Sequence, residues 1–274
     1  MELELKKECL DTYEAGEPQT LTQEETTETI VPDYCPDIAR IISAEGVVCL
    51  HGGAEQEGIS GTVRVTVLYT PENETGVRAL EFAMPFTVQG EGLADCAHVS
   101  AETEIELLES RMLNPRKIFT RCKLVTHLTG YRKVCLTISA DAEAEPGQRV
   151  EKRCCGQNVT LLRQVAEKDL TFSETMSLSL GREGAAELLH CRTGGTVTET
   201  KVIGNKLIFK GVFLVRCCTA PPGANWPPLL RNCLSPRSWR STALERAPRC
   251  PCVCRSPERI SRSTEPTTRA ASWR

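Results

Sequence analysis

The chain lacks any apolar run close to the roughly 20 residues that a helix needs to span a bilayer. Its first seven residues are acidic and polar, whereas a secretory signal begins with basic residues followed by apolar ones. We therefore expect a cytoplasmic protein with no transmembrane segment. Aromatic residues are scarce, at 5%, but 40% of the 274 residues are hydrophobic and 25% are charged. This composition supports a buried core and argues against a wholly disordered chain.

Catalytic signatures are missing too. The chain has no glycine-rich phosphate loop with Lys-Ser or Lys-Thr, no Gly-x-Ser-x-Gly and no His-Glu-x-x-His. The four histidines are far apart in the sequence and are expected to be structural: His51, His98, His127 and His190. We predict no enzyme activity, no catalytic or cofactor-binding residue and no cofactor. An enzyme whose site is assembled from scattered residues stays open as a rival; a histidine beside an acidic or thiol partner in a pocket would favour it.

Two further groups of chemically active side chains give weak signals. Glu102, Glu104 and Glu106 alternate along an expected strand, which predicts a solvated stripe and not an acid–base pair. The fifteen cysteines are odd in number and scattered, so most are expected to be reduced thiols. The vicinal pair Cys154-Cys155 is too strained to bridge easily. One tight group resembles a zinc site, but it lacks the usual spacing in pairs, and we predict no metal: Cys233, Cys250, Cys252 and Cys254.

Charge is unevenly distributed along the chain. Residues 1–216 carry 23 basic and 33 acidic side chains, whereas residues 217–274 carry 10 basic and 3 acidic ones. An acidic body argues against nucleic-acid binding, which needs a basic face to displace counterions from phosphates. It also disfavours anionic membranes.

The composition changes abruptly at residue 217. Residues 217–274 contain no Lys, Asp, Phe or Tyr but 9 of the 16 prolines and all three tryptophans. One interpretation is a disordered arm rich in proline and arginine. The other, which we favour, is a frameshift near residue 216. In a shifted frame, codons for Cys217–Ala220 can encode Leu-Leu-Tyr-Arg, similar to Val67–Thr70, and codons for Asn232–Ser235 can encode Glu-Leu-Pro-Phe, similar to the segment ending at Phe86.

An internal repeat organises the rest of the chain, with an offset of about 150 residues. Each copy has the order short helix, strand, turn, glycine and strand. The first copy comprises Ala39–Ile42, Gly46–Val48 and Gly61–Val65, and the second comprises Ala186–Leu189, Gly195–Val197 and Gly211–Val215. The sequence therefore predicts two copies of one module.

Local patterns predict the elements of each module. Pro36 suits a first helical turn, Ile38, Ile41 and Ile42 then share one face, and Gly46 ends this short helix. Strands are expected where apolar residues alternate: 63–69, 99–107 and 118–128. Gly204-Asn205 is typical of a two-residue hairpin turn. The predicted fold class is mainly β, with antiparallel β-sheet modules, short helices and a disordered C-terminal tail.

These elements divide the chain into four parts. Residues 1–140 form a first β module, 141–148 a linker that contains Pro146-Gly147, 149–216 the start of an incomplete second module, and 217–274 a disordered, out-of-frame tail. The second module is expected to lack the strands that pair with Gly211–Val215 and cover their apolar face. Poor solubility or self-association would follow.

One segment is more distinctive, with the sequence Ile-Val-Pro-Asp-Tyr-Cys-Pro-Asp-Ile-Ala-Arg-Ile at residues 30–41. It resembles the opening signature of the SPOCS domain, which is found in proteins of endospore-forming bacteria. The resemblance extends over about residues 1–216 and includes further segments: Gly61–Tyr69, Met84–Thr87, Asn114–Lys117, Glu167–Phe172 and Thr198–Leu207. At Asn114–Lys117 the family usually has an Asn-Gly-Arg-Lys-like turn, whereas this chain has proline as the second residue.

The resemblance implies a function. Coat-anchoring members of the family are non-enzymatic proteins that act in the mother cell, at the forespore surface, and help to tether the basement layer of the spore coat. The implied partners are other spore coat and morphogenetic proteins. Such members also carry a LysM module and contact the morphogenetic ATPase of the coat; no LysM-like segment follows Arg216 here, so peptidoglycan binding is not expected. The alternative is a ligand-binding or envelope-adhesion β module that acts outside sporulation.

Overall fold

The computed structural model describes residues 3–55, 58–144, 160–165, 167, 173–175, 187–203, 206–220, 229–245 and 270–272. No helix occurs in these ranges. The strands are β1 (Leu3–Ala15), β2 (Gln19–Ile30), β3 (Ile38–Glu55), β4 (Gly58–Pro71), β5 (Arg78–Val88), β6 (His98–Asn114), β7 (Lys117–Ala144), β8 (Ser173–Thr175), β9 (Glu187–Ile203), β10 (Lys206–Ala220), β11 (Leu229–Glu245) and β12 (Ala270–Ser272). All the strand pairs are antiparallel, so the prediction of a mainly antiparallel β protein is confirmed.

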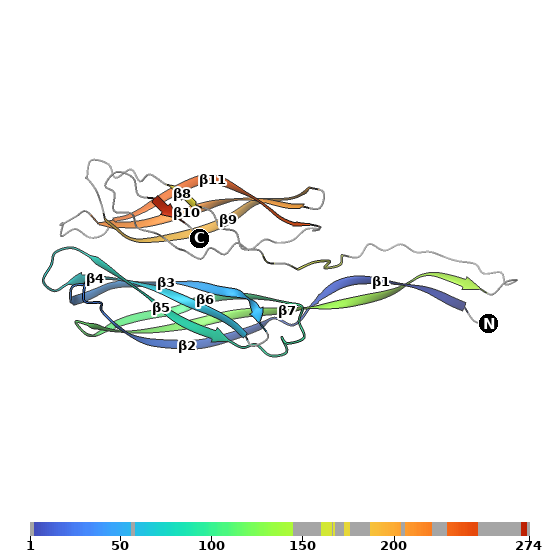
Figure 1. Cartoon of the computed structure of the whole chain (residues 1–274), viewed down its shortest axis with the longest axis horizontal. Coiled ribbons are helices and arrows are strands. Elements are labelled where there is room, and N and C mark those ends of the chain that lie inside the picture. Colours follow the sequence, from blue (N-terminus) through green and yellow to red (C-terminus); the bar gives the residue numbers. More distant parts are fainter. Residues whose placement is uncertain are drawn as a thin grey trace.

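The long strand β7 organises the first sheet (Figure 1). One edge of β7 pairs with β2 and then, further along, with β1, so that residues 3–30 follow it almost from end to end. The other edge pairs with β6, from Asn114 to His98. The first residue of β6, His98, lies opposite Tyr131, so β6 does not reach the last part of β7. That part of β7 pairs with β1 as a two-stranded ribbon.

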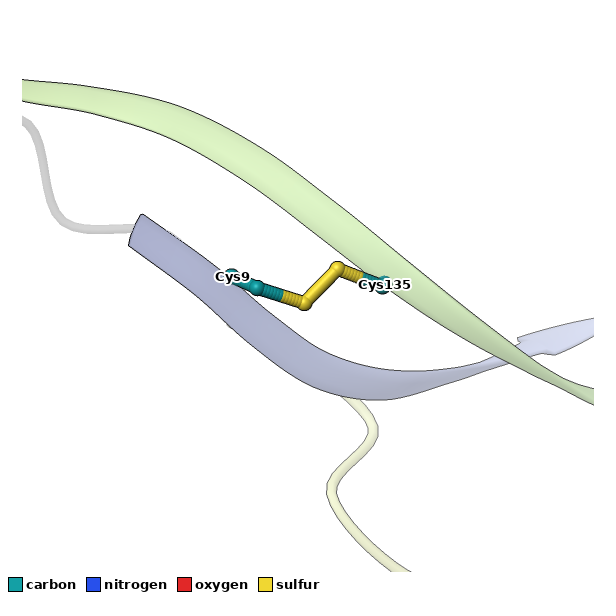
Figure 2. Close-up of a disulfide and its surroundings, with 2 residues drawn as sticks. All are labelled: Cys9 and Cys135. Carbon is teal, nitrogen blue, oxygen red and sulfur yellow. A yellow bond between two sulfur atoms is a disulfide. The ribbon is translucent and has the colours of Figure 1, made fainter. Parts of the chain in front are cut away.

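A disulfide joins the two strands of that ribbon, between Cys9 and Cys135 (Figure 2). The two Cα atoms are 5.7 Å apart although the residues are separated by 126 positions in sequence. These two cysteines therefore differ from the reduced thiols that we expected. Separation in the sequence hides this pair, because only the register of β1 on β7 brings the two residues together.

The second sheet has the order β3-β4-β5 and packs against the first. Val63, Val65, Val67 and Tyr69 on β4 are all buried, as the alternation predicts. They share a core with the buried side chains of β7: Ile118, Cys122, Leu124 and Leu128. We call these two sheets, β1 to β7, the first unit. At one side of this unit Gly46 lets β3 approach β6, because a Cβ at this position would lie 2.7 Å from Ile105 Cδ1.

Both predicted short helices are wrong. Residues 38–45 belong to β3, and Glu187–Leu189 belong to β9. The spacing of Ile38, Ile41 and Ile42 suggested a helix face, but β3 carries irregularities in register at Ile38/Arg40 and Ile41/Ser43. Each irregularity adds a residue to one strand and shifts the side-chain alternation. Apolar residues three positions apart in β3 therefore imitate helical periodicity.

The second unit is the sheet β11-β10-β9. Ile203 pairs with Lys206, so the predicted hairpin across residues 204–205 is confirmed. The prediction that the strand containing Gly211–Val215 lacks partners is wrong, because β10 pairs with β9 on one edge and with β11 on the other. Val215 and Cys217 are also buried, so their apolar face is not left exposed as we expected.

Part of the segment expected to be a disordered tail is therefore strand: residues 217–220 end β10, and β11 lies wholly within that segment. The composition of residues 217–274 gave no sign of a strand, because the hydrogen bonds between neighbouring strands join backbone groups and do not require alternating apolar side chains. The proline at position 236 falls where the β10–β11 register skips, between Ser235 and Trp239, so it does not interrupt a paired stretch. The linker was expected at residues 141–148. Residues 141–144 are instead the last residues of β7, and residues 145–148 lie outside the described residues.

The two units touch through a small apolar cluster. Leu68, Val77 and Ala79 of the first unit pack against Leu189 and Cys218 of the second. Leu68 is only 9% exposed although it lies on the outer face of its sheet, opposite in orientation to the core-facing side chains of β4. This contact explains why β4 is buried on both faces near its end, where simple alternation would predict one wet face.

Candidate docking site

Two segments that carry the family resemblance meet at one end of the first unit. They are the loop 31–37, which joins β2 to β3, and the turn Asn114–Lys117 between β6 and β7. Their backbones bond directly: Val31 N–H donates to Arg116 O at 2.8 Å, and Ile38 N–H donates to Pro115 O at 2.9 Å. Val31 and Ile38 are fully buried. The loop is therefore anchored at both of its ends to the same turn.

The side chain of Arg116 completes the attachment. Its Nη1 donates to Cys35 O at 2.8 Å and to Asp37 Oδ1 at 3.0 Å. Its Nη2 donates to Val31 O at 2.9 Å and to Asp33 Oδ1 at 3.1 Å. The planar guanidinium thus engages four acceptors spread over residues 31–37, which a lysine ammonium could not match with its single point charge. We call this arrangement the Arg116 clamp.

Local geometry prepares both partners of the clamp. Asn114 Oδ1 accepts a hydrogen bond from the Arg116 backbone N–H at 2.9 Å, which shapes the turn. In the loop, Cys35 N–H donates to Pro32 O at 2.9 Å. Beneath it, Tyr69 Oη donates to Pro36 O at 3.3 Å. Burial, reinforced by the neighbouring Cys35 thiol, raises the pKa of Tyr69 to about 12, so this hydroxyl stays protonated and available as a donor.

The clamp presents apolar side chains outward. Tyr34, in the middle of the loop, is 87% exposed. Ile30, the last residue of β2 before the loop, is 72% exposed. Met112 and Leu113, at the end of β6, are also exposed. Ile30 pairs with Lys117, whereas Met112 pairs with the buried Ile118 on the other edge of β7 and so lies on the other face of the sheet from Ile30. We call Ile30 and Tyr34 the clamp patch. Exposed aromatic side chains on a fixed backbone are typical anchors of protein–protein contacts.

The four histidines do not converge. His51 Nε2 lies 2.6 Å from Thr62 Oγ1, and His127 Nδ1 lies 3.0 Å from Thr20 Oγ1. His98 packs near the ring of Tyr131, with centroids 6.2 Å apart. His190 Nε2 lies 3.2 Å from Glu45 Oε2, at the junction of the two units, although without the angles of a hydrogen bond. Each histidine therefore has its own local neighbour on a different part of the sheets.

The predicted carboxylate stripe is where the sequence places it. Glu102, Glu104 and Glu106 are exposed on β6 while the residues between them are half-buried. Glu106 forms an ion pair with Lys123 Nζ at 2.9 Å. The stripe is thus a solvated face, as predicted.

The cysteines give no metal site in the described part of the chain, where no three His, Cys, Asp or Glu side chains are grouped to hold an ion. Cys154 and Cys155 lie outside the described residues, and so do the side chains of the cysteines at positions 233, 250, 252 and 254. One pair does meet: Cys191 and Cys217 face each other across β9 and β10 with their sulfur atoms 3.2 Å apart. The hydrogen bond from Cys191 lowers the pKa of the Cys217 thiol.

Reasoning from the sequence missed both the clamp and the contact between units. The turn was predicted and residues 30–41 were noted as a family signature, but nothing in the sequence indicated that Arg116 reaches back 79 to 85 positions to four acceptors. A signal for the inter-unit contact was present: Leu68 is apolar at a position where alternation predicts a polar side chain.

No family model, curated protein or solved structure matches the chain. Among the described residues, no helix is long and apolar enough to cross a membrane.

Proposed function

We propose that this chain is a non-enzymatic scaffold that anchors other proteins during spore coat assembly. The observation that carries the proposal is the Arg116 clamp. It joins the loop of the Val-Pro-Asp signature to the turn Asn114–Lys117, two of the segments on which the SPOCS resemblance rests. The clamp supports the proposal because it makes the two segments one fixed surface.

The clamp also supports a role in binding. A surface that presents Tyr34 from a loop fixed by four hydrogen bonds loses little conformational entropy when a partner docks on it. Aromatic residues are enriched among the side chains that dominate protein interfaces. The proposed partners are other spore coat and morphogenetic proteins, which the chain would meet in the mother cell cytoplasm at the forespore surface. Peptidoglycan is not a proposed ligand.

The test uses a fluorescent fusion of the full chain, expressed in a sporulating endospore former. The proposal expects a shell of fluorescence around the forespore that appears only after the mother cell compartment has formed. Tyr34→Ser should reduce this shell to diffuse mother cell fluorescence, because it removes the exposed anchor without touching the core. Ile203→Ser is the matched control: Ile203 is also strongly exposed, but it lies on β9 in the second unit, and its loss should leave the shell intact.

Two outcomes would contradict the proposal. Fluorescence of the unmodified fusion that is diffuse at every stage would remove the coat assignment. Production during vegetative growth, with no change at sporulation, would favour the alternative of a ligand-binding or envelope-adhesion module. Equal loss of the shell in Tyr34→Ser and Ile203→Ser would retain the coat assignment and exclude the clamp patch as its docking surface.

A further inference from the structure

We propose that Cys191 and Cys217 are a reactive thiol pair that hydrogen peroxide converts to a disulfide, with Cys217 as the attacking thiol and Cys191 as the resolving thiol. The pair lies in the second unit, between β9 and β10. The proposal does not depend on a role in the spore coat or on the Arg116 clamp.

The first argument is the geometry of the pair. Cys191 on β9 is directly opposite Cys217 on β10, within a stretch of β10 whose register is regular from Gly211 to Cys218. Directly opposed residues of antiparallel strands place their side chains next to each other on the same face. The two sulfur atoms are 3.2 Å apart, whereas the sulfur atoms of a disulfide are about 2.05 Å apart. A disulfide can therefore form without any change in strand pairing.

The second argument is the reactivity of Cys217. The hydrogen bond from Cys191 lowers the pKa of the Cys217 thiol, against the opposing effect of burial. Cys217 is therefore more readily present as the thiolate, which is the form that attacks an oxidant. The adjacent Cys218 differs, because burial raises the pKa of its thiol. Cys218 also packs in the contact between the units, whereas Cys191 and Cys217 share a separate cluster with Val215.

The third argument identifies the oxidant. Cys191 and Cys217 are both only 4% exposed. Hydrogen peroxide is close to water in size, so it can reach such a site through small openings that exclude a bulky disulfide. The resolving thiol is already in contact with the attacking one. Disulfide formation should therefore precede attack by a second peroxide molecule, which would produce a sulfinic acid.

The chemistry takes two steps. The Cys217 thiolate attacks one oxygen of hydrogen peroxide, so that a sulfur–oxygen bond forms, the oxygen–oxygen bond breaks, and the departing hydroxide takes up the proton released by Cys217 to become water. Cys217 is now a sulfenic acid. The Cys191 sulfur then attacks Cys217 Sγ, so that the disulfide forms and the sulfur–oxygen bond breaks. The departing hydroxide takes the Cys191 proton and becomes the second water. Both thiols are oxidised, and the peroxide is reduced.

The disulfide would fix the second unit close to its contact with the first. Cys217 is adjacent to Cys218, and Leu189 precedes Cys191 by two positions; Leu189 and Cys218 both belong to that contact. The cross-link joins residues 26 positions apart and so restricts the opened chain. Hydrogen exchange of β10 peptides should slow by at least about tenfold on oxidation. Exchange that is unchanged in the oxidised chain would contradict this effect.

The first test treats the full chain with hydrogen peroxide and maps its peptides by mass spectrometry without reduction. The peptides of Cys191 and Cys217 should be linked, and dithiothreitol should separate them. The link should form about tenfold faster than Cys218 is oxidised, because only Cys217 has a lowered pKa. Cys218→Ala is the matched control and should leave this rate unchanged.

Three results of the first test would overturn the proposal. One is that both thiols remain after Cys218 has been oxidised. Another is that Cys217 becomes linked to a different cysteine, such as Cys233, whose backbone pairs with Val215 on the other edge of β10. The third is that Cys218→Ala prevents the link. The unmodified chain alone decides the first two, so they do not depend on the folding of a variant.

The second test assigns the two roles. Cys191→Ser removes the resolving sulfur but keeps a hydroxyl that can donate to Cys217, whereas Cys191→Ala removes both. With no resolving thiol, Cys217 should accumulate as a sulfenic acid, which is trapped by unfolding the oxidised chain in dimedone. Labelling of Cys217 should be several-fold faster in Cys191→Ser than in Cys191→Ala. Equal labelling in the two variants, or oxidation of Cys191 at an unchanged rate in Cys217→Ser, would overturn the assignment of Cys217 as the attacking thiol.

Discussion

The sheets β3-β4-β5 and β9-β10-β11 have the same order, and each strand of the second begins about 150 residues after its counterpart in the first. Their surroundings differ. The first sheet packs against a second sheet organised by β7 and shares a core of sixteen buried residues with it. The described core of the second sheet is a small cluster, of Cys191, Val215 and Cys217, with a further contact to the first unit through Leu189 and Cys218. Equal strand order therefore does not produce equal cores.

The largest expected effect is a difference between two leucine truncations. Leu124 is fully buried between the sheets of the first unit, and Leu189 is almost fully buried at the junction with the second. Leu124→Ala should lower the free energy of unfolding of the first unit by about 4 kcal/mol, because the tightly packed core cannot close the cavity. Leu189→Ala should cost about 2 kcal/mol, since the smaller cluster can collapse further. Urea unfolding followed by hydrogen exchange of β4 and β10 peptides separates the two losses.

The contrast between the two cores would be contradicted if each leucine variant increased hydrogen exchange equally in the β4 and β10 peptides. That result would show that the two units unfold as one cooperative structure and that the size of the local core does not matter. Val134→Ala, on the exposed ribbon, is the control, because a half-buried side chain with few neighbours should cost well under either leucine.

Sequence patterns predicted parts of β4, β6 and β7, because one physical signal dominates in those three strands, but they did not predict β1, β2 or β5. Val63, Val65, Val67 and Tyr69 alternate with polar residues, and burial on one face of a sheet selects that pattern. The same reasoning failed in β3, where irregular register gives the isoleucines a helix-like spacing. It also failed in β11, whose place is set by the open edge of β10 and not by its own composition.

The candidate site could be predicted only in part. The turn was predicted and the signature at residues 30–41 was noted, but the four bonds of Arg116 depend on the distance between two segments in the folded chain. That distance is set by where each strand ends, which side-chain alternation does not encode.

A second prediction concerns the clamp, which closes one end of the first unit. Arg116→Met keeps much of the aliphatic bulk but leaves Asp37 and the carbonyls of Val31 and Cys35 without their donor. We expect a loss of about 2 kcal/mol and faster proteolysis within residues 31–37, because partly buried acceptors lose their partner. Arg78→Met is the matched control, since its exposed pair with Glu74 should contribute under about 1 kcal/mol. Equal losses in the two variants would reduce the clamp to an ordinary surface ion pair.

A third prediction concerns the stability of the first unit at alkaline pH. Burial raises the pKa of Tyr69 from 10.0 to about 12 and that of Cys122 from 9.0 to about 11, with smaller help from nearby groups. Unfolding frees both groups to ionise at their ordinary values, so the stability that they contribute is complete below about pH 9 and is lost as the pH rises to about 12. By the repeat offset, the position of Tyr69 corresponds to Thr219, which does not titrate in this range.

The measurement is the urea midpoint of the first unit, followed through β4 peptides between about pH 8 and pH 11. The midpoint should be constant up to about pH 9 and then fall. Cys122→Ala should start from a lower stability but show a shallower fall, and Tyr69→Phe should do the same at the upper end of the range. A midpoint that declines with the same slope in all three chains would mean that other groups cause the loss.

The smallest expected effect tests the contact that joins the two units. Leu68 packs on Cys218, which is buried and whose thiol pKa is raised mainly by that burial. Leu68→Asn should cost only about 1–2 kcal/mol, because its side chain lies on the outer face of the first sheet and not in its main core. It should nevertheless increase the rate of Cys218 alkylation several-fold, since separation of the units exposes the thiol to solvent. Cys122, deep in the first unit, should react at an unchanged rate in the same sample. Acceleration of both cysteines would indicate general unfolding, and acceleration of neither would show that Cys218 is shielded without help from the first unit.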